Sequence, residues 1–140
     1  MNKLVLLISA FLIGCAAPSY KREPELDSRL ASSLSCWKAD MTGAKLDWVS
    51  GFSRINRIVV GELPSGKLGL YDQWICSVTV SDLAVGEGPY STRATLYHEL
   101  GHAVFGLEHG SCAIMGTGMN EDWWRENWDS VKQEYILEIK

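Results

Sequence analysis

The chain contains three histidines, and all of them lie in one twelve-residue segment, His98-Glu-Leu-Gly-His102-Ala-Val-Phe-Gly-Leu-Glu-His109. The first five residues of this segment have the pattern H-E-x-x-H. Residues four apart on a helix share a face, about 6 Å apart, so His98 and His102 can bind one zinc ion through ring nitrogens at about 2.0–2.1 Å. Glu99 then faces another side of the ion, where its carboxylate can act as general base on a water molecule. The alternative interpretation is a pair of helix-surface histidines with no ligand.

His109 can join the same site only if the helix ends before it. On a continuous helix, the seven residues from His102 to His109 would cover about 10 Å along the axis. Gly106 supplies a break, because glycine adopts the left-handed conformation that ends helices without a steric penalty. Three protein ligands with one open position are typical of a catalytic zinc site, so we expect one Zn²⁺ per chain.

With these residues, the sequence resembles the metzincin clan of zinc metalloproteases. The signature of that clan is H-E-x-x-H-x-x-G-x-x-H followed by a methionine-containing turn, and Ser111-Cys-Ala-Ile-Met-Gly116 is similar to such a turn. The resemblance implies that the three histidines bind zinc and that Glu99 is the general base. It also implies that Met115 forms a hydrophobic floor under the metal.

One feature departs from that signature. Three residues separate His102 from Gly106, whereas the signature has two. One extra helical residue rotates the end of the helix by about 100° and advances it by about 1.5 Å, so we expect the following turn to compensate. The lengthened motif, with an Ile-Met turn and an aromatic C-terminal helix, is similar to that of small bacterial and phage metallopeptidase-like proteins. This resemblance covers roughly residues 90–140 and does not identify a substrate.

Two other residues compete for a place on the metal. Gluzincin proteases take their third ligand from a glutamate further along the chain, and Glu121 falls at a suitable separation from H-E-x-x-H. The other interpretation is that Glu121 and Asp122 begin the last helix, where the helix dipole favours acidic residues. Cys112 can also contact zinc, but a thiolate there would close the open position.

The N-terminus has the pattern of a secretory signal peptide. Lys3 precedes an apolar run from Leu4 to Ile13, which is too short to span a bilayer as a mature helix. The run ends in Leu-Ile-Gly-Cys15, which resembles a bacterial lipobox. The resemblance implies removal of residues 1–14, a diacylglycerol on the Cys15 thiol and palmitate on its new amino group.

Several acyl chains anchor a protein stably at a membrane. We therefore expect a lipoprotein of the cell envelope. Ala16 and Ala17 carry no acidic inner-membrane retention signal, which favours the outer membrane over the inner membrane by resemblance to Gram-negative lipoproteins.

The remaining chain is expected to comprise a flexible tether over residues 15–25 and one metalloprotease-like domain over residues 26–140. A net charge of −4 and a pI near 5.3 disfavour a nucleic-acid partner. We expect a monomer whose partners are a protein or peptide substrate and, through the lipid, the membrane. One disulfide and one free thiol are expected among the three remaining cysteines, Cys36, Cys76 and Cys112.

The hydrophobic pattern predicts an α+β domain with a mixed sheet. An N-terminal helix through about residue 40 follows from apolar residues at helical spacing, namely Leu26, Leu30, Leu34 and Trp37. Residues 54–62 and 74–80 are predicted strands, separated by a turn at residues 64–66. By analogy with metzincins, the segment from Trp74 to Asp82 is expected to present an exposed edge to an extended peptide. The alternative is an internal strand.

Two further helices are expected in the second half. A loop at residues 86–89 leads to the helix that carries His98, for which Ser91 or Thr92 is the expected N-cap. After the methionine turn, one apolar face of a last helix is expected to pack on the domain, with Trp123 as the most exposed aromatic residue; its members are Trp124, Trp128, Val131 and Tyr135.

These residues together predict a zinc metalloendopeptidase, a hydrolase in which Glu99 takes a proton from water and returns it to the leaving amine. The alternative is a non-catalytic zinc-binding surface lipoprotein that acts as a binding module. A purely structural site has no use for the carboxylate of Glu99 between its histidines.

Overall fold

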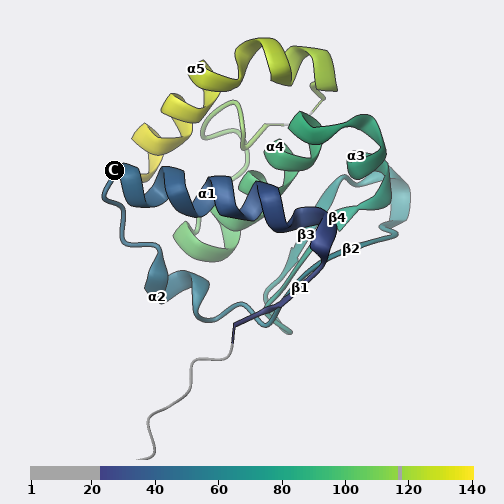
Figure 1. Ribbon diagram of the computed structural model, residues 1–140, viewed down its shortest axis with the longest axis horizontal. Helices are drawn as coiled ribbons and strands as arrows, with labels where there is room; N and C mark the ends of the chain where they lie inside the picture. The colour runs from purple at the N-terminus through teal and green to yellow at the C-terminus, as the bar shows by residue number, and fades with distance from the viewer. Residues whose placement is uncertain (1–22, 117) are drawn as a thin grey trace, which may run out of the picture.

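A mixed four-stranded sheet with helices packed around it forms the domain in the computed structural model, which describes residues 23–116 and 118–140 (Figure 1). Strands β1 (Glu25–Leu26), β2 (Arg57–Gly61) and β4 (Ser77–Ser81) are parallel, and β3 (Gly69–Asp72) runs antiparallel to β4. The order across the sheet is β1-β2-β4-β3. The α+β class and the mixed sheet are confirmed.

The position of β4 corrects one prediction. β4 lies between β2 and β3, where Val78 and Val80 are fully buried, as expected for β-branched residues in a central strand. The segment from Trp74 to Asp82 is therefore not a sheet edge. Its first residues form the turn of the β3–β4 hairpin, and the edge strand beside it is β3, a strand that the hydrophobic pattern did not predict.

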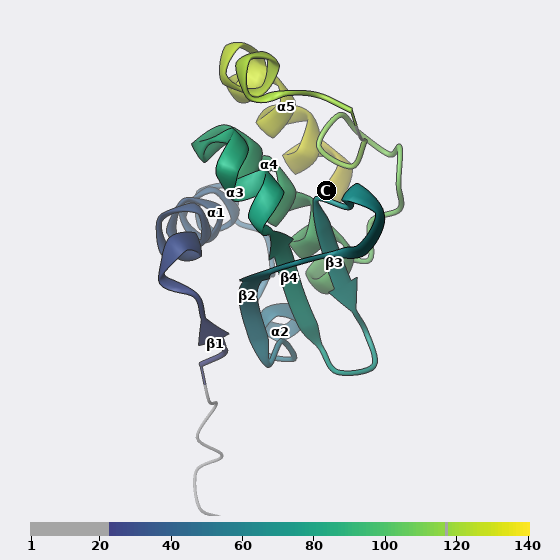
Figure 2. The same cartoon turned by 90° about the vertical axis from the view of Figure 1, so that its right-hand side faces the viewer.

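The central helix, α4 (Pro89–Leu100), contacts β3, β4 and two other helices, α1 (Ala31–Gly43) and α5 (Glu121–Ile139). Figure 2 shows α4 between the sheet and α5. Three shorter helical elements complete the fold: a 3₁₀ turn at Ser28–Leu30, α2 (Val49–Phe52) and α3 (Asp82–Glu87). A further 3₁₀ turn, Pro64–Gly66, lies at the predicted turn between strands.

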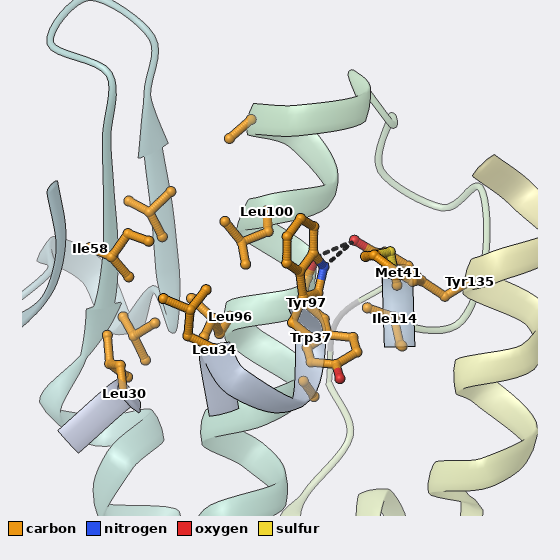
Figure 3. Packing of buried hydrophobic residues seen from close by; sticks show 14 of the residues in the cluster. Leu30, Leu34, Trp37, Met41, Ile58, Leu96, Tyr97, Leu100, Ile114 and Tyr135 are labelled. Atoms are coloured by element: carbon orange, nitrogen blue, oxygen red, sulfur yellow. Dashed lines mark hydrogen bonds between the residues drawn. The ribbon is translucent and has the colours of Figure 1, made fainter. Parts of the chain in front are cut away.

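The core between α1, α4 and α5 is built around three buried aromatic residues (Figure 3). The Tyr135 hydroxyl donates to the main-chain oxygen of Tyr97 at 2.9 Å and accepts from Trp37 Nε1 at 3.4 Å. The Tyr135 hydroxyl and the Trp37 indole N–H therefore both have hydrogen-bond partners inside the core. The predicted face of α5 is buried as expected, in the residues Trp124, Trp128, Val131 and Tyr135.

Several predicted boundaries are wrong. Leu26 is 40 % exposed and belongs to β1, and the N-terminal α-helix begins only at Ala31. Most of the segment before α4 is helix α3 rather than loop. Gly88 precedes α4 in place of the expected Ser91 or Thr92, because Pro89 supplies the fixed φ that suits a first helical position.

Two predictions about exposed and bonded side chains also fail. Trp123 is half-buried, and the most exposed aromatic residue in the described part of the chain is Trp74, with 88 % exposure. Cys36, on α1, Cys76, in the β3–β4 turn, and Cys112, in the segment before α5, are all free thiols, so the expected disulfide is absent among the described residues. Within the described residues, no helix combines the length and apolar character that crossing a membrane requires.

Candidate metal centre

The helix that carries the first two histidines changes from α to π geometry at Gly101, just before the second of them. Residues Gly101–Phe105 continue α4 as a π-helix, in which the Gly106 N–H bonds to the Gly101 carbonyl five residues earlier. A π turn accommodates one residue more than an α turn. The extra residue before Gly106 is therefore absorbed inside the helix, and the expectation that the following turn compensates is wrong.

Gly106 ends this helix as predicted. It adopts a left-handed conformation with φ 68° and ψ 25°, which a side chain would disfavour. The Leu107 N–H then bonds to the Gly101 carbonyl at 3.1 Å. The chain reverses here and brings His109 back to the helix.

The three imidazoles converge through the same ring atom. The Nε2 atom of His102 lies 3.1 Å from Nε2 of His98 and 3.1 Å from Nε2 of His109. Two nitrogens held at about 2.0–2.1 Å in a tetrahedral zinc site are about 3.3 Å apart. The cluster therefore has the dimensions of a three-histidine site for a single metal ion.

The other ring nitrogens fix the tautomers of two of the histidines. Nδ1 of His98 lies 2.9 Å from the Ile114 carbonyl, and Nδ1 of His102 lies 2.6 Å from the Leu107 carbonyl. A carbonyl only accepts, so each Nδ1 carries the proton and each Nε2 presents a lone pair. These lone pairs repel each other across 3.1 Å unless a cation lies between them, as it does in metal sites with this arrangement.

Burial keeps both of these rings neutral. Loss of solvent, opposed by the bond to Ile114 and assisted by the two neighbouring histidines, lowers the pKa of His98 to about 4. Burial also lowers the pKa of His102. Neutral imidazole is the form that binds metal, so the surroundings favour the binding state at neutral pH.

The predicted methionine turn lies against this helix. Met115 is fully buried, and a Cβ placed on Gly101 would come within 2.8 Å of its sulfur atom. The Gly110 N–H bonds to the Met115 carbonyl at 2.9 Å, which closes the loop just after His109. Met115 thus packs under the helix and ties the third histidine to it, while its neighbour Ile114 orients His98.

Glu99 is buried beside the cluster, with 6 % exposure and its Oε1 atom 4.0 Å from His98 Nε2. Burial raises its pKa to about 7, although the Tyr71 N–H and the charge of Lys67 lower it in part. A carboxylate with a pKa near the working pH is suited to general acid–base chemistry.

The edge strand β3 approaches the Glu99 side chain closely at Gly69. A Cβ on Gly69 would lie 2.5 Å from Glu99 Oε1 and 2.8 Å from the Thr95 methyl group, so only glycine fits at this position. The contribution of Gly69 is not predictable from the sequence, because a single glycine outside a recognised element carries no signal of what it touches.

A cleft of about 1150 Å³ opens over these residues. It is lined by the three histidines, Glu99 and the whole segment from residue 66 to residue 74, which includes β3, and also by Gly116, Gly118 and Met119. The candidate ligands and the buried carboxylate therefore share one open space with the edge of the sheet.

Glu121 lies at the other end of α4. Its two carboxylate oxygens accept the backbone N–H groups of Tyr90, at 3.3 Å, and Ser91, at 2.7 Å. Ser91 precedes His98 by seven residues, about 10 Å along the helix. Glu121 is thus outside the histidine cluster and binds a helix N-terminus, as acidic groups favour.

Other candidate residues are not brought to the cluster. Asp122 pairs with Arg125 at 2.6 Å on the first turn of α5, and Cys112 is not part of the histidine group. Cys15, with the signal peptide and most of the tether, lies outside the described residues.

No family model matches this chain, and no match was found among curated proteins or solved structures. The interpretation of the site therefore depends on the chain's own residues and their geometry.

Proposed function

We propose that this protein is a zinc metalloendopeptidase of metzincin-like design, with His98, His102 and His109 as the zinc ligands and Glu99 as the general base. The observation that carries the proposal is the meeting of three Nε2 atoms beside a buried carboxylate in an open cleft. Gly106 keeps the interval to the third histidine that the metzincin signature has, and Met115 lies in the turn after it, which supports the same assignment.

A bound Zn²⁺ ion would supply a Lewis acid for the scissile carbonyl and lower the pKa of the attacking water. The chain's own part in the reaction falls to Glu99. Its carboxylate lies on the cleft side of His98, so Oε1 can take the proton from water and hand it to the leaving amine. Gly69 leaves the space that Oε1 occupies, because a Cβ at this position would lie 2.5 Å from that atom.

The substrate that best fits the cleft is an extended peptide paired with β3. Ser81 N donates to the Leu68 oxygen at 2.7 Å, which sets the alternation of the β3–β4 ladder. The main-chain groups of Gly69 and the carbonyl of Tyr71 consequently point away from β4, toward the outer edge, while the Tyr71 N–H bonds to Glu99. An incoming peptide can add a strand at this edge and thereby pass over Glu99.

Glu99→Gln tests the enzymatic proposal. The neutral amide cannot accept the proton, so we expect cleavage of an unstructured protein to fall by at least about 100-fold, the lower end of the contribution of general acid–base catalysis. Zinc content, measured by atomic emission, should remain near one ion per chain. Unchanged cleavage with full zinc would contradict the assignment of the base and favour the non-catalytic binding module.

We further propose that the chain is a lipoprotein anchored through Cys15 in the cell envelope, at the outer membrane. The support is the sequence pattern at residues 3–15. Cys15→Ala should move the protein from the membrane fraction to the soluble fraction, and mass spectrometry of the N-terminal peptide should show the acyl groups on the parent chain only.

A further inference from the structure

The turn between β3 and β4 exposes two large apolar side chains next to each other. Trp74 is 88 % exposed and Ile75 is 57 % exposed. The backbone beneath them is fixed, because Asp72 Oδ1 accepts the Trp74 N–H at 2.9 Å and Asn56 Nδ2 donates to the Ile75 oxygen at 3.1 Å. Single exposed apolar residues are common on protein surfaces, so the location of this pair decides its meaning.

The Trp74–Ile75 turn lies at the end of the sheet where the chain enters the domain. Glu25 pairs with Arg57, and Arg57 pairs with Ser77, so the first residues of β1, β2 and β4 are aligned across the sheet. These strands are parallel, and the residues before Glu25 and before Ser77 therefore leave the sheet at the same end. Figures 1 and 2 both show the start of β1 and the β3–β4 turn at this end, with α5 at the opposite end.

The tether is short compared with the domain. Eight residue steps separate Cys15 from Glu23, the first described residue. At about 3.5 Å per step, a fully extended chain reaches no more than about 28 Å. A lipid on Cys15 therefore keeps this end of the sheet close to the bilayer surface.

We propose that the Trp74–Ile75 turn inserts into the interfacial layer of the bilayer that holds the Cys15 lipid. The inference depends on the proposed lipid anchor and is independent of peptidase activity. Tryptophan favours the membrane interface, where its ring is buried and its N–H stays hydrated. A second point of contact fixes the orientation of the domain that a flexible tether leaves free.

The orientation has a consequence for the substrate. Trp74 also lines the cleft, through which β3 leads to the histidine cluster. With the turn at the bilayer, the cleft opens beside the membrane surface. Peptide segments that lie close to the bilayer are then the substrates with direct access.

The test uses the full-length lipidated chain on phosphatidylethanolamine and phosphatidylglycerol vesicles in which part of the lipid carries brominated acyl chains. Bromine quenches only tryptophans that contact the lipid. The chain has six tryptophans, so we expect a loss of up to one sixth of the emission. Trp74→Phe should abolish this loss. Trp123→Phe, at the start of α5 on the far end, is the matched control and should retain it.

Each result decides between the proposals. Quenching that disappears only in Trp74→Phe supports insertion of the turn. Equal quenching in the parent and Trp74→Phe chains, or none in a parent chain that floats with the vesicles, overturns insertion and leaves the anchor intact. A parent chain that does not float with vesicles overturns the anchor and the insertion together.

Discussion

The carboxylate at the N-terminal end of α4 and the imidazoles at its C-terminal end differ in whether partners within the chain satisfy them. At the N-terminal end, the carboxylate of Glu121 accepts two backbone N–H groups, so each partner satisfies the other. At the C-terminal end, the Nε2 lone pairs of His98 and His102 face one another at 3.1 Å, and the Glu99 carboxylate is buried beside them. Buried polar groups are normally paired. The histidine cluster is therefore the group suited to a ligand from outside the chain, whereas the bonded carboxylate of Glu121 contributes to stability.

The largest effect on zinc affinity should come from replacing His109, one of the two candidate third ligands, by alanine. His109→Ala removes one of three converging nitrogens. We expect zinc affinity to fall by more than about 100-fold, since loss of a residue that only hydrogen-bonds to a metal ligand already lowers metal affinity 10–100-fold. Competition with a chromogenic chelator measures the change. Glu121→Ala is the control and should leave the affinity unchanged, because its carboxylate is bonded to α4. The reverse result would show a gluzincin-type site.

A smaller effect, on the rate of cleavage, is expected from a substitution in β3 next to Glu99. In Gly69→Ala, the new methyl group would lie 2.5 Å from Glu99 Oε1 and must displace it. A shift of about 1 Å can cost 10²-fold in rate, so we expect cleavage to fall by roughly that factor with zinc affinity unchanged. Gly86→Ala is a suitable control, because a Cβ there has no neighbour within 4 Å. Loss of zinc in Gly69→Ala would show instead that β3 supports the metal ligands.

The local part of this site could be predicted from the sequence, and the non-local part could not. The spacing of His98, His102 and Gly106 is a property of one helix and its end, so the pattern itself contains the geometry. The extra residue before Gly106 was visible, but a turn and a π-helix can both absorb one residue. The choice depends on what packs against the helix, here Met115 against Gly101.

β3 shows the same limit on a larger scale. Its four residues, Gly-Leu-Tyr-Asp, have too little alternation to predict a strand, and the strand exists because it pairs with β4. Because the sequence does not predict β3, the segment of β4 was expected at the edge of the sheet, where β3 lies instead. The prediction of a disulfide is wrong for a related reason: a count of cysteines contains no distances, and the three described thiols are free.

The smallest effects are opposite changes in stability when each glutamate is replaced. In the metal-free protein, the pKa of Glu99 is about 7, above the value of 4.5 for an unfolded chain. The folded state thus binds more protons between these values, so Glu99 costs stability as the pH rises through this window, and the full cost is present above pH 7. Glu99→Gln removes the charge. We expect it to raise the free energy of unfolding at pH 8 by on the order of 1–2 kcal/mol.

Glu121→Ala should act in the other direction. Removal of a side chain that accepts backbone N–H groups at a helix N-terminus costs about 1 kcal/mol, and this loss should appear at pH 8, where the carboxylate is charged. Urea unfolding of the metal-free variants at pH 8 and pH 4.5 measures both changes. The gain in Glu99→Gln should vanish at pH 4.5, because the parent carboxyl is then protonated in the folded state. If Glu99→Gln destabilises the metal-free protein at pH 8, the carboxylate is satisfied within the chain, and the contrast between the two ends of α4 does not hold.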